Sequence, residues 1–360
     1  MSQLASAVPR VGLRPGAARA SAVPLLALGF ALSIGLLLIG VTGVPMRQAL
    51  AAFWEGVAGS DYAVVGSIAR GVPLSLVGLG YVLAERGNLT NVGGEGQIAV
   101  GGIASCATAL YFGAASLPTP LCFLFPLLVG SLAGAAWGAV AGALKARRGS
   151  SEVITSLLLS FIALQLVYGS VQSEHFLRQP ITSSSTLPES LPIPPRTELP
   201  LLLAGSGLPL HAGVLLELLL AGLVTLFLAR SRLGLELLAV GQNPQAARRA
   251  GLAVGRFVVL AMAGSGALGG LAGAIMVQGD QHYLTAGFSS GYGFDGLVVG
   301  LLARGSALSV VVYALLFGCL RSGGLAMEMS AAVPSAVVVI CQGLIVVTVA
   351  GAAHFAQRRA

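Results

Sequence analysis

Ten apolar runs, each of roughly 15–25 residues, recur along this chain of 360 residues. A helical run of this length can cross the hydrocarbon core of a bilayer, which is about 30 Å thick. Hydrophobic residues make up 56% of the sequence and charged residues only 9%, which excludes a water-soluble domain because its surface could not be wetted. We therefore expect an all-α polytopic membrane protein with about ten transmembrane helices. The runs lie near 22–41, 63–84, 92–113, 121–144, 152–171, 211–229, 256–277, 291–303, 306–320 and 334–353.

The positions of the basic residues predict how these spans are oriented. If the N-terminus is cytoplasmic, fifteen of the 20 lysines and arginines fall in cytoplasmic segments. The other five are Arg47, Arg70, Arg178, Arg196 and Arg321. The positive-inside rule favours this orientation, in which the N- and C-termini are both cytoplasmic.

The same topology divides the chain into segments. Cytoplasmic tails are expected at 1–21 and 354–360, on either side of a transmembrane domain at 22–353. Within that domain, residues 172–210 form an extracytoplasmic loop rich in proline and serine, with little regular structure. Residues 230–255 form a cytoplasmic segment. The long loop separates two halves of five spans each.

Two acidic residues, Glu95 and Asp295, lie within apolar runs beside glycines. A charge at the bilayer centre costs at least about 2.5–3.5 kcal/mol, so each acid needs a compensating partner or a water-filled cavity. Glycines match at the offset between the two acids, Gly93 with Gly293 and Gly96 with Gly296. An offset of five spans reverses the chain direction and therefore predicts two inverted five-helix halves. Such segments point to a transporter's central site, although the acids could equally cap broken helix ends.

Polar and aromatic residues near these acids form a candidate substrate pathway. Amides and hydroxyls can hydrogen bond a sugar, and aromatic rings can stack on a flat base. Buried polar groups that satisfy one another would explain the same residues equally well. The candidates are Asn91, Glu95, Gln97, Thr155, Phe161, Tyr292, Phe294 and Asp295.

Glycines also occur at a spacing of four in the fourth apolar run, at Gly130, Gly134, Gly138 and Gly142. This spacing places a smooth stripe along one side of a helix, where another helix can approach closely. We expect the stripe to pack within the chain. The glycines of 264–269 satisfy the pattern GxGxxG, but they lie inside a span and are expected to serve packing as well.

A short polar and basic segment lies between the sixth and seventh runs. Asn243 is a suitable N-cap, Pro244 suits the first helical position, and Gly251 can end the helix in a left-handed conformation. An isolated helix of two turns is marginal in water. Either the rest of the protein or a partner must therefore support it.

The chain carries no phosphate-binding loop of its own. That motif requires lysine followed by serine or threonine, and the only lysine, Lys145, is followed by Ala146. A separate ATPase would need a cytoplasmic docking element, which the basic segment supplies. An ion-coupled secondary carrier that uses Glu95 and Asp295 remains an alternative, as does a membrane scaffold without transport. The four histidines show no metal-binding spacing, so no metal is expected.

Three segments resemble the permease subunits of bacterial binding-protein-dependent ABC importers, in the nucleoside and simple-sugar (branched-chain amino acid-like) branch. Asn91–Gln97 is similar to the family's Asn-Ile-Gly-Ala-Glu-Gly-Gln, and Glu152–Thr155 matches Glu-Val-Ile-Thr. Gly234–Gly251 resembles the coupling segment that docks the ATPase, with Leu238 in the place of an arginine. The likeness covers nearly all of the chain after the first span.

The resemblance implies a permease subunit in the bacterial inner membrane and not an enzyme. Its partners would be an ABC ATPase subunit, a second permease that is identical or homologous, and an extracytoplasmic substrate-binding lipoprotein, without nucleic acid. The chain would bind no cofactor, because the partner ATPase uses ATP and Mg. The expected cargo is a nucleoside or related ribose-containing solute, with a simple sugar or a flavin as alternatives. The implied ATPase-coupling residues are Gly241, Asn243, Pro244, Ala246, Ala247 and Gly251.

Overall fold

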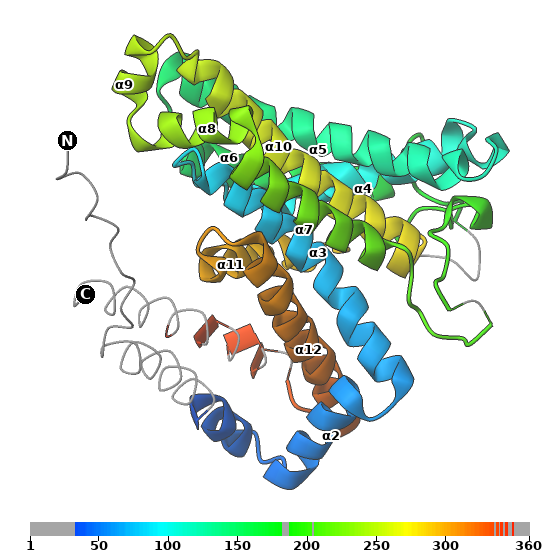
Figure 1. Ribbon diagram of the computed structural model, residues 1–360. Coiled ribbons are helices and arrows are strands. Elements are labelled where there is room, and N and C mark those ends of the chain that lie inside the picture. Colours follow the sequence, from blue (N-terminus) through cyan, green and yellow to red (C-terminus); the bar gives the residue numbers. More distant parts are fainter. Residues whose placement is uncertain are drawn as a thin grey trace. The chain divides into compact units, whose positions relative to one another are not determined.

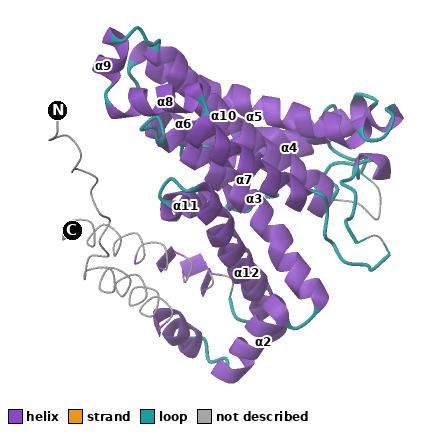
Figure 2. Cartoon of the chain, in the orientation of Figure 1, coloured by secondary structure: helices purple, strands orange, loops and turns teal. Residues whose placement is uncertain are grey.

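The computed structural model describes residues 33–181, 187–203 and 205–334, with scattered positions between 336 and 348. The chain forms two compact units, 51–330 and a second that comprises 1–50 and 331–360. The described elements are helical, with only isolated bridges and no strand (Figures 1 and 2). This confirms the all-α prediction. The helices are α2 (Met46–Ala58), α3 (Asp61–Glu85), α4 (Gly94–Tyr111), α5 (Leu121–Arg148), α6 (Glu152–Gln172), α7 (Gly213–Arg230), α8 (Arg232–Gln242), α9 (Pro244–Arg249), α10 (Val254–Ile275), α11 (Tyr292–Ala303) and α12 (Ala307–Ala331).

The predicted runs from 63–84 to 306–320 each coincide with one of these helices. Within the described residues, six helices are long and apolar enough to cross a membrane, or seven if Ser33–Val41 and Met46–Ala58 form one bent span. α11 is a shorter apolar helix, and α4 begins with polar residues. The run at 334–353 and the first part of 22–41 lie largely outside the described residues.

α3 and α10 form the centre of the larger unit. About 78% of the apolar window of α3 is buried and 67% of that of α10, against 28% for α6. α10 packs on α3, α4 and α5, while α7 and α11 also pack on α3 (Figure 1). α6 packs on α4 and α5 and leaves most of its surface exposed. The exposed surface of α6 is therefore available to lipid, to another subunit or to a solute.

Glycines allow α5 and α10 to approach each other closely. A methyl group on Gly134 would collide with the backbone of α10 at Gly266, one on Gly138 would collide with it at Met262, and one on Gly266 would collide with Gly134. At the ends of the stripe, a Cβ on Gly130 would lie 2.8 Å from Ala274 and one on Gly142 would lie 2.9 Å from Val259. The predicted intramolecular packing of the stripe is confirmed, and so is the packing role of the 264–269 glycines.

The segment 172–210 contains little regular structure where it is described, as predicted. It holds one short 3₁₀ helix, Pro195–Thr197, and isolated bridges. Hydrogen bonds fasten it to the chain that follows α10, since Ser190 N donates to Leu284 O at 2.9 Å and Gln278 Nε2 donates to Thr197 O at 2.6 Å. Gln278 belongs to a π-helical extension of α10, Met276–Gln281.

Candidate functional site

The two glycine-flanked segments that match in sequence lie against each other in space. α4 begins at Gly94 and α11 begins at Tyr292. Gly293 is packed on the backbone of Glu95 so closely that an added Cβ would collide with it. A Cβ on Gly94 would lie 3.0 Å from Gly293 O. The first turns of the two short helices therefore meet, and glycine is required at their contact.

Glu95 joins these two helix starts. Its side chain is buried, with the residue only 3% exposed. Oε1 accepts from Ser289 Oγ at 2.6 Å and from Gly291 N at 3.0 Å, and Oε2 accepts from Gly293 N at 2.7 Å. The carboxylate of α4 thus caps the N-terminus of α11, where backbone N–H groups are unpaired and the helix dipole favours negative charge. The expectation of a compensating partner is confirmed.

Asp295 is compensated in a different way, by Arg321. The two side chains form an ion pair with Nη2–Oδ2 of 2.9 Å, and their exposed fractions are 23% for Asp295 and 18% for Arg321. The guanidinium also donates to Ser290 O at 2.8 Å and lies 3.8 Å from the centre of the Tyr292 ring. The sequence interpretation placed Arg321 after a span that ended at 320. The helix itself continues to Ala331, and the ion pair compensates the charge of Arg321 within it.

The side-chain amides of Asn91 and Gln97 hydrogen bond to each other at the start of α4. Asn91 Nδ2 donates to Gln97 Oε1 at 3.1 Å and to Ser265 Oγ at 2.7 Å, while Gln97 Nε2 donates to Asn91 Oδ1 at 3.2 Å. Asn91 is 4% exposed and Gln97 2% exposed. The sequence allowed two interpretations of these residues, a substrate pathway or buried polar groups that hydrogen bond to one another. Asn91 and Gln97 fit the second.

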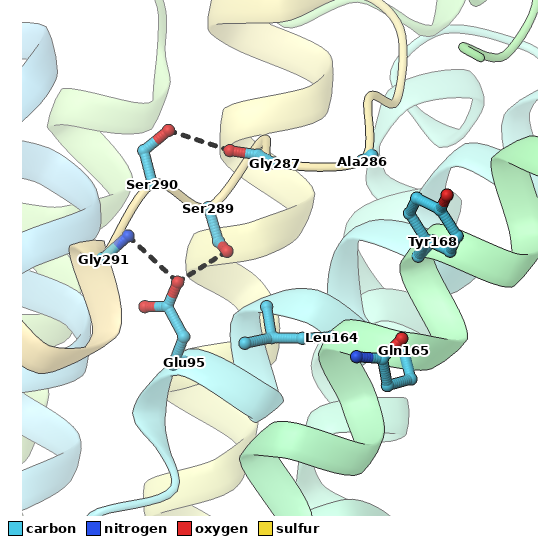
Figure 3. Close-up of a pocket in the computed structure, with 9 residues that line it drawn as sticks. All are labelled: Glu95, Leu164, Gln165, Tyr168, Ala286, Gly287, Ser289, Ser290 and Gly291. Carbon is cyan, nitrogen blue, oxygen red and sulfur yellow. Dashed lines mark hydrogen bonds between the residues drawn. The ribbon is translucent and has the colours of Figure 1, made fainter.

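A pocket of about 540 Å³ opens beside Glu95. α6 contributes one side through Leu164, Gln165 and Tyr168, and the loop before α11 contributes another (Figure 3). The volume lies within the ~300–1,000 Å³ typical of small-molecule sites. The full lining is Glu95, Leu164, Gln165, Tyr168, Ala286, Gly287, Ser289, Ser290 and Gly291.

The other predicted pathway residues do not line this pocket. Thr155 Oγ1 donates to the carbonyl oxygen of Ser151, the N-cap residue of α6, at 2.9 Å. Phe161 and Phe294 are 55% and 38% exposed, and Tyr292 lies under Arg321. Among the predicted residues, only Glu95 lies in the pocket wall.

Sequence reasoning missed the α6 residues Gln165 and Tyr168 and the serines Ser289 and Ser290. For Gln165 a signal was present, because a glutamine in the middle of an apolar run needs a polar partner. The serines gave no such signal, since they follow the seventh run in what reads as an ordinary polar connection.

The predicted short helix forms at α9. Asn243 Oδ1 accepts from Gln245 N at 3.1 Å and from Ala246 N at 3.0 Å, and Pro244 occupies the first helical position. Gly251 follows with φ +84°. The predicted N-cap, first-position proline and left-handed glycine are all confirmed.

The rest of the protein supports this helix on one side. Leu237 and Val240 of α8 and Ala247 of α9 are buried in an apolar cluster with residues of α3, α5 and α10. A Cβ on Gly241 would lie 2.6 Å from Arg86 O, at the end of α3. On the outer side, Asn243, Pro244, Gln245, Ala246, Arg248 and Arg249 are exposed. The segment is thus anchored, with a polar and basic surface that no described residue covers.

Several known proteins are similar in sequence to this chain over most of its length. The chain is 35% identical to the guanosine ABC transporter permease protein NupP of Bacillus subtilis over 91% of the chain and 92% of that protein. It is 30% identical to the glucose ABC transporter permease protein TsgB13 of Haloferax volcanii, with 93% and 88% covered. It is 28% identical to the nucleoside ABC transporter permease protein NupB of Lactococcus lactis, with 90% and 89% covered. No solved structure matches the chain significantly.

The sequence also matches a family model over residues 63–349, which covers most of the chain. The description of that family is "Branched-chain amino acid transport system / permease component". With its long apolar helices, the chain is a multi-pass membrane protein and a transport component. The chain belongs to the family of branched-chain amino acid transport system permease components.

Proposed function

We propose that the chain is the membrane-spanning permease subunit of an ATP-driven importer for a nucleoside or related ribose-containing solute. The observation that carries this proposal is the anchored but outwardly exposed α8–α9 segment. A helix held by the bundle on one side can transmit motion between a partner and the spans. Its uncovered side is where an ATPase subunit would dock, at the cytoplasmic face of the inner membrane.

The coupling role falls on Gly241, Asn243, Pro244, Ala246, Ala247 and Gly251. Asn243 and Pro244 set where α9 begins, and Gly251 sets where it ends. Gly241 and Ala247 hold it to the bundle. The complete importer would contain two permeases, identical or homologous, two ATPase subunits that use ATP and Mg, and a substrate-binding lipoprotein outside.

Nucleosides are the favoured cargo because relatives from two bacteria carry guanosine or nucleoside in their names. A simple sugar is the second candidate, since a 30% identical relative is a glucose permease. Uptake of radiolabelled guanosine and glucose by vesicles that contain the whole transporter separates the two. Saturable guanosine uptake that glucose does not compete for supports the first assignment.

The coupling role is tested with the permease purified together with its ATPase subunits. Asn243→Ala combined with Pro244→Ala should abolish solute-stimulated ATP hydrolysis, because α9 loses its N-cap and its preset first residue. Asn243→Ser, which keeps a capping side chain, should retain most of the stimulation. Ser206→Ala, in an exposed loop with local hydrogen bonds only, is the matched control. Unchanged stimulation in the double variant would overturn the coupling role.

An ion-coupled carrier is less well supported, because both membrane acids are engaged. Glu95 accepts three hydrogen bonds and Asp295 is paired with Arg321. In sealed vesicles, solute uptake should require ATP on the side of the membrane that carries the ATPase subunits. It should persist when the proton and sodium gradients are dissipated. Uptake that collapses with the gradient at constant ATP would replace the proposal with the carrier.

A further inference from the structure

α6 carries a glutamine, Gln165, on a side that the described chain leaves exposed. Close to it on the same helix are apolar side chains, including Leu166, which is 47% exposed. Among the described residues, nothing hydrogen bonds the Gln165 side chain. An amide without a partner is strongly disfavoured in hydrocarbon. Gln165 therefore faces water, a solute or another protein, and this side of α6 differs from a lipid-facing surface.

Gln165 does not stand alone, because it shares the pocket wall with Tyr168. The two residues are three positions apart, which places them on neighbouring parts of one helix face. Tyr168 is 51% exposed. Figure 3 shows both on the α6 side of the pocket, while Glu95 and the loop of Ser289 and Ser290 lie on the other side. The pocket thus combines an aromatic ring and an amide on one wall with oxygen atoms on the opposite wall.

The opposite wall retains capacity to accept hydrogen bonds. A carboxylate offers about four acceptor positions, and Glu95 uses three of them, two on Oε1 and one on Oε2. Ser290 Oγ donates to Gly287 O at 2.8 Å and keeps its own lone pairs. A solute with hydroxyl groups at one end can therefore donate to Glu95 and Ser290.

Building on the importer function proposed above, we propose that Gln165 and Tyr168, together with Glu95 and Ser290, form a nucleoside-binding subsite in the translocation path. The base stacks on Tyr168, and its polar edge hydrogen bonds with the amide of Gln165. The ribose hydroxyls donate to the Glu95 carboxylate and Ser290 Oγ. A planar ring with hydrogen-bonding edges joined to a polyol matches both walls, whereas a simple sugar has hydroxyl groups for the polar side chains but no planar base to stack on Tyr168.

The subsite is tested by cysteine labelling of the full-length chain in membrane vesicles. Gln165→Cys should react with a charged, water-soluble thiol reagent above the background of the unsubstituted chain, and millimolar guanosine should slow the reaction. Leu166→Cys is the matched control, because Leu166 is the next residue and exposed but does not line the pocket. Its reaction should be insensitive to guanosine.

Two results would overturn the subsite. One is a Gln165→Cys chain that the reagent does not label, which would place this face against lipid or another subunit. The other is labelling that guanosine leaves unchanged or that glucose alone slows. Because protection requires no ATPase, protection without ATP-driven uptake would refute the importer function while the subsite stands. Uptake of guanosine without protection would do the reverse.

A second set of variants tests the stacking contact in the Gln165→Cys background. Tyr168→Ala should raise the guanosine concentration that gives half-protection by about tenfold or more, as loss of a base–aromatic stack does elsewhere. Tyr168→Phe keeps the ring and should change that concentration by less than about threefold. Equal effects of the two substitutions would show that the ring does not stack on the base.

Discussion

Glu95 and Asp295 occupy corresponding positions beside two matching glycine segments, yet the protein compensates their charges differently. Glu95, on α4, is buried and is held by two backbone N–H groups and one serine hydroxyl. Asp295, on α11, is partly exposed and is held by the side chain of Arg321 from α12. The internal match thus predicts where an acid lies, while the neighbouring helices decide what neutralises it.

The difference has a mechanical consequence. Two of the donors to Glu95 are backbone N–H groups at the start of α11, and the Glu95 side chain is buried, so these bonds tie α4 to the backbone of α11. The partner of Asp295 is a long side chain, which can rotate while the helices stay in place. We therefore call the hydrogen bonds of Glu95 to the start of α11 the fixed joint, because they hold the two helix starts together. We call the Asp295–Arg321 ion pair the adjustable joint, because its side chains can move while the helices stay in place.

The largest expected effect concerns the glycine contact at the fixed joint. Gly293→Ala places a methyl group on the backbone of Glu95, and overpacking that no rotamer change can relieve should cost at least about 3 kcal/mol. The folded fraction after detergent extraction should fall sharply, as measured by size-exclusion chromatography over a temperature series.

Gly93→Ala is the matched control for this substitution. The atoms nearest its added Cβ are Asn91 Oδ1 at 2.9 Å, Gln97 Nε2 at 3.1 Å and Ser156 Cβ at 3.1 Å, and the two amide ends can shift by a few tenths of an ångström. It should therefore be clearly milder than Gly293→Ala. Equal losses at the two positions would mean that the backbone contact does not set the joint.

Much of the fold could be predicted from the sequence because the bilayer sets one length scale for every span. Each apolar run between 63 and 320 became a helix, and the Asn243-Pro244 pair together with Gly251 defined α9, since capping depends on local residues only. The helix of the last run continues past 320 to Ala331, because the charge of Arg321 inside it has a partner, Asp295, that local sequence does not reveal.

The candidate site could be predicted only in part. Glu95 was found because an acid in an apolar run stands out, but Asn91 and Gln97 proved to be engaged with each other. Tyr168, Ser289 and Ser290 come together only when α6 packs beside the α11 loop. Which side of α6 faces this pocket depends on tertiary packing, which hydropathy does not encode.

The second prediction weakens the fixed joint without adding volume. Glu95→Gln keeps the shape of the side chain but removes the charge and turns an NH₂ group toward a backbone donor. The loss of charge-assisted hydrogen bonds and one unsatisfied buried donor should cost about 2–4 kcal/mol. Thermal unfolding of the purified chain should therefore shift downward, by less than for Gly293→Ala. A stability equal to that of the unsubstituted chain would show that the carboxylate does not hold α11.

The smallest effect is expected at the adjustable pair. Asp295→Asn leaves Arg321 with its bond to Ser290 O and its contact with the Tyr292 ring, and partial exposure lets water replace the lost carboxylate. The cost should be about 1–2 kcal/mol. A double-mutant cycle with Arg321→Gln should then give a coupling energy of about 0.5–2 kcal/mol between the two side chains. Two results would contradict the distinction between a fixed and an adjustable joint. If Asp295→Asn costs as much free energy of unfolding as Glu95→Gln, the two acids depend equally on their surroundings. If the coupling energy is zero, Arg321 is not the partner that permits Asp295 in the membrane.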